Sequence, residues 1–168
     1  VAEFSKKDYL YGSLNPLSKE ITKKSFTISF WFNDRYPRTS QKNLFSFEGY
    51  DTGLFLNNGN QIIGQVWDVN KKHDQVVLNY SRNIWNHIIF EYDYKEKSIT
   101  LTLNGKHQNT QSLKEDFEIF DYTNKHIKIS DKESDISISS ILVFDSLLND
   151  TIREEPVSYT HLTLPTTD

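Results

Sequence analysis

The sequence predicts an all-β fold of two antiparallel sheets, a β-sandwich or a barrel, and three observations support this. About a dozen short segments alternate apolar with polar residues, as half-buried strands do. Turn-forming residues separate these segments at short intervals, and no repeat that would indicate a propeller or solenoid runs along the chain. Aromatic residues make up 14% of the sequence, which favours strands over helices.

The clearest element is a hairpin over Trp85–Lys106. Apolar or aromatic residues occupy every second position on both of its strands, so each strand has one buried face and one solvent-exposed face. Lys95–Lys97 supplies a charged turn between the strands. Asn104 and Gly105 follow the second strand, and this pair suits the φ > 0 positions of a tight primed turn.

The other strands follow the same alternation. The strongest is Ser25–Phe32, SFTISFWF, and a second hairpin signal at Asn57–Asn60 separates two strands. In chain order the remaining strand segments are two short strands within Ala2–Tyr11, then Asn43–Phe47, Gly53–Leu56, Gln61–Trp67, Gln75–Tyr80, Lys106–Gln111, Lys125–Ser130 and Asp135–Phe144. A short C-terminal helical turn is predicted at Leu147–Glu155, where Asn149 or Asp150 could provide the N-cap before Pro156.

The length of the chain and a change in composition near its end indicate one domain followed by a tail. Its 168 residues suit a single domain, which we place at Val1–Glu155. Pro156–Asp168 differs in composition from the rest of the chain, which is rich in Lys, Asn and Asp. Its segment PVSYTHLTLPTT resembles a translated sequencing-library adapter. The alternative is a genuine terminal linker or strand. We therefore expect a fragment from environmental sequencing, with neighbouring domains of the polypeptide missing and a tail excluded from the fold.

Composition excludes several classes of partner. The net charge is −4 and the pI about 5.7, so no basic stripe is available for nucleic acid or an anionic membrane. The apolar runs are too short to span a bilayer, and the sequence shows no signal peptide. Cys is absent, which excludes disulfides and thiolate metal sites.

Four motifs in order resemble the laminin-G-like, concanavalin A-like lectin/glucanase domains. They are SFTISFWF at Ser25–Phe32, WNHIIFEYD at Trp85–Asp93, ITLTLNGK at Ile99–Lys106 and ISISSILVFDSLLNDTIREE at Ile136–Glu155. The resemblance covers essentially all of Val1–Glu155 and implies a two-sheet jelly roll with variable loops at one rim. The lectin-like segment of clostridial neurotoxins shares this order of motifs, and we treat it as a structural cousin.

The family includes glycoside hydrolases, so the acidic residues need examination. Glucanases of the superfamily use a Glu-x-Asp-x-(x)-Glu strand, and Glu91, Asp93 and Glu96 match that pattern. Glu96, however, falls in the predicted turn, and Lys95 and Lys97 beside it indicate a solvated hairpin end. No Ser-His-Asp constellation stands out, and His87 is expected to be packed. We therefore predict no catalytic residues and no enzyme activity.

Candidate ligand-binding residues lie in two neighbouring loops. Lectin sites pair an aromatic platform with hydrogen-bonding Asn or Asp side chains, because a sugar has an apolar face and a polar rim. Five residues supply these types: Tyr50, Asp51, Trp67, Asp68 and Asn70. Trp67 ends a strand and could instead belong to the core. Tyr36 is a further candidate.

Calcium is the usual metal of the resembled family. Asp51, Asp68, Asn70 and Asp74 lie in predicted loops and could converge on such an ion. No loop carries a D-x-D-x-D-G signature, and solvated loop acids are the simpler interpretation. We therefore predict no metal site and no required cofactor, with Ca²⁺ as the alternative.

These observations together predict a non-catalytic module that binds a glycan or a protein surface. The resemblance implies a place in a larger extracellular or particle-surface protein. Two alternatives remain: a glycoside hydrolase of the superfamily, and a structural spacer of a phage tail or adhesin without a ligand of its own. Neither nucleic-acid binding nor membrane insertion is expected.

Overall fold

The computed structural model describes residues 2–4, 10–13, 25–35, 40–47, 52–120, 126–129, 136–144 and 146–148. Twelve strands lie within these ranges, and the described residues form no helix. The strands are β1 (Ala2–Phe4), β2 (Leu10–Ser13), β3 (Phe26–Asp34), β4 (Lys42–Phe47), β5 (Gly53–Leu56), β6 (Gln61–Trp67), β7 (His73–Asn79), β8 (Trp85–Asp93), β9 (Ser98–Leu103), β10 (His107–Ser112), β11 (His126–Ile129) and β12 (Ile136–Phe144).

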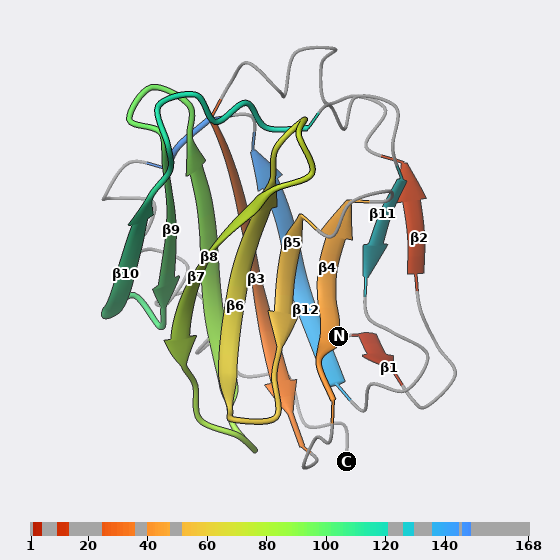
Figure 1. The fold of residues 1–168 in the computed structure, drawn as a ribbon. Helices are drawn as coiled ribbons and strands as arrows, with labels where there is room; N and C mark the ends of the chain where they lie inside the picture. The colour runs from red at the N-terminus through yellow and green to blue at the C-terminus, as the bar shows by residue number, and fades with distance from the viewer. Residues whose placement is uncertain are drawn as a thin grey trace, which may run out of the picture.

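The strands form two six-stranded antiparallel sheets packed face to face, which confirms the predicted sandwich (Figure 1). Sheet A has the order β1-β12-β3-β8-β9-β10, and sheet B has the order β2-β11-β4-β5-β6-β7. In Figure 1 sheet B is the front layer. At one side of the sandwich the edge strands β7 and β10 meet, where Asn109 Nδ2 donates to the Val77 carbonyl at 3.0 Å.

The core lies between the sheets and takes every second residue of the central strands. Phe26, Ile28, Phe30 and Phe32 of β3 are at most 1% exposed, as their alternation predicts. The rings of Phe26 and Phe90, from adjacent strands, pack edge to face with centroids 6.1 Å apart. Gly64 leaves room for Phe90, because a Cβ there would lie 2.7 Å from the Phe90 ring.

The predicted hairpins are present. Asn104 and Gly105 have φ of 54° and 66°, as a primed turn requires, and the Lys106 N–H donates to the Leu103 carbonyl at 3.1 Å. β1 lies within the expected segment Ala2–Tyr11, whereas β2 begins inside it and extends two residues beyond its end, to Ser13.

Two details differ from the sequence-based expectation. β7 begins at His73, two residues earlier than expected, because the polar His73 pairs with Trp67 across the hairpin. Leu147 and Leu148, the first residues of the expected helical turn, are not helical, and the rest of that turn lies outside the described residues. The predicted tail from Pro156 also lies outside them.

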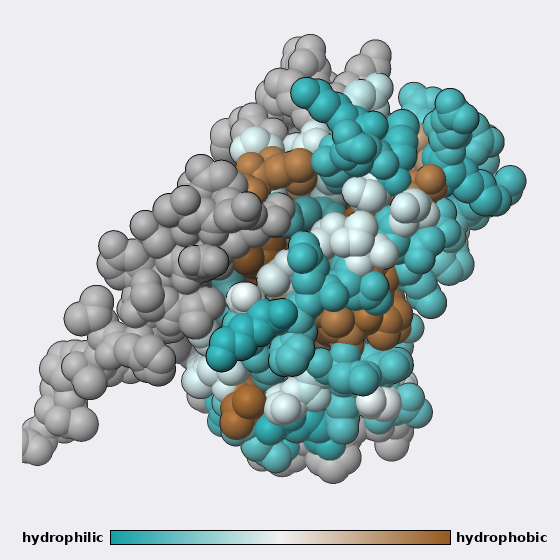
Figure 2. Space-filling model, turned by 90° about the vertical axis from the view of Figure 1, so that its left-hand side faces the viewer, coloured by the Kyte–Doolittle hydropathy of each residue, from teal (hydrophilic) through white to brown (hydrophobic). Residues whose placement is uncertain are grey.

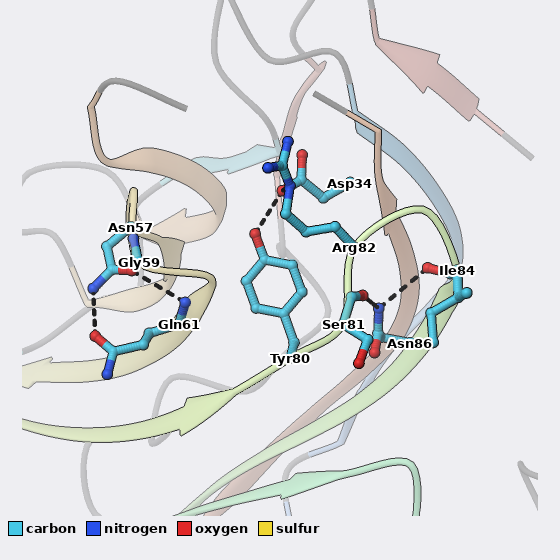
Figure 3. A network of polar contacts seen from close by, with 9 residues as sticks. All are labelled: Asp34, Asn57, Gly59, Gln61, Tyr80, Ser81, Arg82, Ile84 and Asn86. Carbon is cyan, nitrogen blue, oxygen red and sulfur yellow. Dashed lines mark hydrogen bonds and ion pairs between the residues drawn. The ribbon is translucent and has the colours of Figure 1, made fainter. Parts of the chain in front are cut away.

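Loops at the two rims are tied to both sheets. At one rim the segment 113–120 joins two hairpin turns, since the Phe120 N–H donates to the Trp67 carbonyl and Lys97 Nζ donates to the Phe117 carbonyl. At the other rim a buried polar cluster joins the end of β3 to the segment after β7, with the Tyr80 hydroxyl donating to Asp34 (Figure 3). No helix in the described part of the chain is long and apolar enough to cross a membrane.

Candidate functional site

A stacked aromatic pair closes one end of the β6–β7 hairpin. Trp67 and His73 are cross-strand partners, and their ring centroids lie 4.8 Å apart with the planes tilted by 32°. Trp67 is half-buried and His73 is exposed. The Trp67 N–H donates to Thr52 Oγ1 at 2.8 Å, which fixes the end of β6. The pair therefore lies on the outer face of sheet B, at the rim.

Asp68 shapes the loop between these two aromatic residues. Asp68 is only 5% exposed, and its Oδ1 accepts the Lys72 N–H at 2.8 Å. The Asp68 N–H in turn donates to the Lys72 carbonyl at 2.8 Å, so the loop is closed at its base. A buried carboxylate that accepts a backbone N–H of its own loop stabilises the conformation of that loop.

Asn70 is an exposed polar residue of this loop, as are Lys71 and Lys72. The Asn70 Nδ2 donates to Asp68 Oδ2 at 3.4 Å, and an amide side chain has a carbonyl oxygen that can accept further hydrogen bonds. Of the predicted binding set, the structure thus brings Trp67, Asp68 and Asn70 together in one hairpin. Tyr50 and Asp51 lie outside the described residues, as does Tyr36.

The alternative calcium ligands do not converge among the residues that the structure describes. Asp74 is a half-buried residue of β7, paired with Val66, and the Asp68 carboxylate is directed at its own loop. Asp51 lies outside the described ranges. Within these ranges no group of three or more His, Asp or Glu side chains is placed to hold a metal ion.

The acidic residues that match the glucanase pattern have three different environments. Glu91 is 3% exposed, and its Oε1 accepts the Leu148 N–H at 3.2 Å. Asp93 Oδ1 accepts the N–H groups of Lys95 and Glu96 at 2.9 and 3.2 Å and so caps the hairpin turn. Glu96 is exposed in that turn. Backbone N–H groups thus engage Glu91 and Asp93, and Glu96 lies in the turn, whereas a retaining glycosidase needs a pair of carboxyl groups that flank the scissile bond.

A buried serine–histidine pair lies on the outer face of sheet A. Ser29 Oγ and His87 Nε2 are 2.9 Å apart, and the His87 ring lies 5.0 Å from the Trp31 ring. Burial lowers the pKa of His87 from 6.5 to about 4, because the imidazolium would lose its hydration there. His87 Nδ1 has no hydrogen-bond partner among the described residues, so no carboxylate completes a triad. The Ser29–His87 pair is therefore buried and structural, as predicted for His87.

Sequence reasoning missed the residues that flank Trp67 across the hairpin. His73 stacks on Trp67, and Gln65 pairs with Gln75 one row further along the same face. The signal was the five-residue loop Asp68–Lys72, whose length sets which residues of β7 oppose β6. Alternation alone predicts that two residues share a face without predicting which of them are neighbours.

Comparisons with known proteins agree with this architecture. Residues 6–149 match the family model of the concanavalin A-like lectin/glucanases superfamily. Similar solved structures include the botulinum neurotoxin serotype D binding domain, with a TM-score of 0.78 and 18% identity. That likeness covers 95% of this chain and 43% of the neurotoxin chain.

Two further neighbours were solved with ligands. The binding domain of botulinum neurotoxin DC in complex with SialylT has a TM-score of 0.69 and 16% identity, covering 86% of this chain and 37% of that one. The same domain in complex with rat synaptotagmin II has a TM-score of 0.72 and 14% identity, covering 92% and 40%.

This chain spans less than half the length of these neighbours. At such identities the likeness shows the fold alone. No curated protein sequence is significantly similar to the chain. The family model covers most of the chain, and the sandwich that it implies is the one observed. The chain therefore belongs to the concanavalin A-like lectin/glucanases superfamily, in its laminin-G-like branch.

Proposed function

We propose that this chain is a non-catalytic binding module that recognises a glycan or a protein surface through one rim of the sandwich. The observation that carries the proposal is the Trp67–His73 pair, an aromatic surface half-open to solvent beside the exposed amide of Asn70. An aromatic ring with a neighbouring amide suits a sugar face, and it also suits a protein hot spot. Asp68 holds the loop, and Tyr50 and Asp51 are proposed to complete the site.

Two further points support a binding role over an enzymatic one. Glu91 and Asp93 are engaged in backbone hydrogen bonds, and Glu96 lies apart in the turn. The neighbouring binding domains were solved with SialylT and with rat synaptotagmin II. A module of this kind belongs in a larger extracellular or particle-surface protein, and we propose that location. No cofactor is part of the proposal.

The test is a glycan array probed with the chain and with Trp67→Ala, each in CaCl₂ and in EDTA. We expect at least one glycan to bind and the variant to lose about tenfold or more in affinity, since a central aromatic residue contributes ~1.4 kcal/mol or more. Trp85→Ala is the matched control, because Trp85 is 39% exposed on sheet A, away from the proposed rim.

Two outcomes contradict the proposed site. If both tryptophan variants bind equally well, the rim around Trp67 is not where the ligand sits. If the unmodified chain binds neither a glycan nor any protein in a cross-linking experiment on intact cells, the spacer alternative replaces the binding function. Loss of binding in EDTA alone would instead assign a calcium-dependent site.

A further inference from the structure

The outer face of β5, β6 and β7 has no formally charged side chain. By strand register, its described positions are Gly53, Phe55, Gln61, Ile63, Gln65, Trp67, His73, Gln75, Val77 and Asn79. Asp, Glu, Lys and Arg make up 25% of the sequence, so two or three charges would be expected among ten positions. None of the four residue types occurs there, and four of the ten residues are Gln or Asn.

The accessible part of this face is the two-strand strip of β6 and β7. Phe55 and Gln65 are only 5% and 9% exposed, whereas His73, Gln75 and Asn79 are exposed. Gln61, Ile63, Trp67 and Val77 are half-buried between them. In Figure 1 these strands belong to the front layer of the sandwich. Figure 2 views the side with β10 and β7, where hydrophobic residues form small separate patches among hydrophilic ones.

Cross-strand pairing arranges the strip in four rows. Trp67 and His73 form the first, Gln65 and Gln75 the second, Ile63 and Val77 the third, and Gln61 and Asn79 the fourth. Trp67 is six positions beyond Gln61, so the strip is about 20 Å long at ~3.4 Å per residue. Stacked rings lie at one end, followed by the exposed amide of Gln75 beside the buried Gln65, then an aliphatic row, and then the amides of Gln61 and Asn79. The strip therefore offers both apolar and hydrogen-bonding surface along one line.

This chemistry selects an uncharged ligand rich in hydroxyl groups. Carboxamides both donate and accept hydrogen bonds, as sugar hydroxyls do, and aromatic and aliphatic side chains cover the C–H faces of pyranose rings. A sulfated or carboxylated glycan would find no Lys or Arg at the strand positions of this face, since Lys71 and Lys72 lie in the loop beyond its first row. One atom of the Gln61 carboxamide is already used within the hairpin turn, since Asn57 Nδ2 donates to Gln61 Oε1 at 2.7 Å.

We propose that the β6–β7 strip binds a neutral oligosaccharide or polysaccharide chain that lies along the strands with one sugar ring against Trp67 and His73. This inference rests on the proposed binding function. It extends the site from the rim loop to the sheet face and restricts the ligand to neutral glycans. A protein ligand on the same strip is an outcome of the test rather than a second proposal.

The probes are cello-, xylo-, manno- and chitohexaose, with hexagalacturonate and a heparin hexasaccharide as charged counterparts. Titration calorimetry on the full chain is expected to show binding to at least one neutral probe. The affinity should change less than about twofold between about 0.05 and 0.5 M NaCl, because no fixed charge on the strip takes part. Gln75→Glu should weaken binding at least about fivefold, since the new carboxylate has no N–H donors and loses hydration when the ligand covers it.

Gln108→Glu is the matched control. Gln108 is exposed on β10 and pairs with Thr102, which places it on the outer face of sheet A. Gln75→Glu and Gln108→Glu add the same charge to an exposed amide position of an edge strand, so only the face differs. Unchanged binding by Gln108→Glu together with weakened binding by Gln75→Glu supports the strip.

Three results overturn the inference, and they separate it from the proposed function. If only the charged probes bind, or if affinity falls steeply with salt, the ligand is not neutral. If Trp67→Ala loses binding while Gln75→Glu binds like the unmodified chain, the rim site stands and the strip does not. If the chain binds none of the glycans but binds a protein ligand, the binding function stands and the neutral-glycan strip is wrong.

Discussion

Asp34 is fully buried, and residues from other parts of the fold provide its partners. Tyr80 donates its hydroxyl to Asp34 Oδ2 at 2.5 Å, and Arg82 Nε lies 3.4 Å from the same oxygen (Figure 3). The Asn83 N–H donates to the Asp34 carbonyl at 2.9 Å. A buried carboxylate is tolerated only with such partners, and these join the end of β3 in sheet A to the segment after β7 in sheet B.

Tyr80→Phe should therefore destabilise the protein by about 1.5–3 kcal/mol, because the ring is kept while a hydrogen bond to a buried charge is lost. Urea unfolding at neutral pH measures this. Tyr94→Phe serves as control, since Tyr94 is exposed and its ring, which lies 4.7 Å from Lys97 Nζ, is retained. Equal stability of the two variants would show that the Asp34 cluster does not depend on the Tyr80 hydroxyl.

His87 should make stability depend on pH. Its pKa is about 4 in the folded chain and 6.5 when unfolded, so below pH 6.5 the unfolded state takes up a proton that the folded state does not. Stability is then full above pH 6.5 and is lost progressively as the pH falls to 4, by up to about 3 kcal/mol at ~1.4 kcal/mol per pH unit. Urea unfolding at intervals from pH 4 to 8 measures the loss.

His87→Gln should flatten that part of the profile, because the amide does not titrate and can still bond Ser29. His107→Gln is the control, since His107 is exposed on β10. A profile of His87→Gln that keeps the slope of the unmodified chain would assign the acid sensitivity to other groups.

At the scale of elements, residues 146–148, which follow β12, are hydrogen-bonded to the outer face of sheet A. Thr27 Oγ1 donates to the Ser146 carbonyl at 2.7 Å, and the Leu148 N–H donates to Glu91 Oε1 at 3.2 Å. Leu148 is itself only 7% exposed. Alternation predicts that Glu91 lies on the solvent-exposed face of β8. The contact with Leu148 explains why Glu91 is buried instead.

Glu91→Ala should lower the free energy of unfolding by about 1–3 kcal/mol, because a buried N–H of Leu148 loses its acceptor. Glu91→Gln keeps an oxygen acceptor and should cost clearly less. The comparison also addresses the glucanase alternative, since neither variant is expected to alter ligand affinity on the array. A ligand affinity that falls in Glu91→Gln without loss of stability would return Glu91 to the list of functional residues.

At the scale of the whole molecule, the division at Glu155 remains a prediction. A chain ending at Glu155 should fold with an unfolding free energy within about 0.5 kcal/mol of the 168-residue chain, because an adapter-derived tail has no reason to pack on the sandwich. Chemical denaturation of the two chains side by side measures the difference. A loss of more than about 1 kcal/mol would mean that the tail is part of the domain.

Much of the fold was predictable because strand formation here depends on local alternation. The hairpin Trp85–Lys106 carries its own turn residues, and Asn104 and Gly105 adopt the positive φ that their chemistry favours. The candidate site was predictable only in part. Trp67 and Asn70 were recognised by residue type, whereas the contribution of His73 and Gln75 depends on cross-strand register.

The sequence by itself determined which segments are strands, which face of each strand is apolar, and the family to which the chain belongs. Tertiary structure alone decided what covers the second face of β8 and which residues oppose Trp67. The physical reason is the range of the interactions. Alternation and turn chemistry act over a few residues, whereas the contacts of Asp34 with Tyr80 and of Glu91 with Leu148 join positions 46 and 57 residues apart.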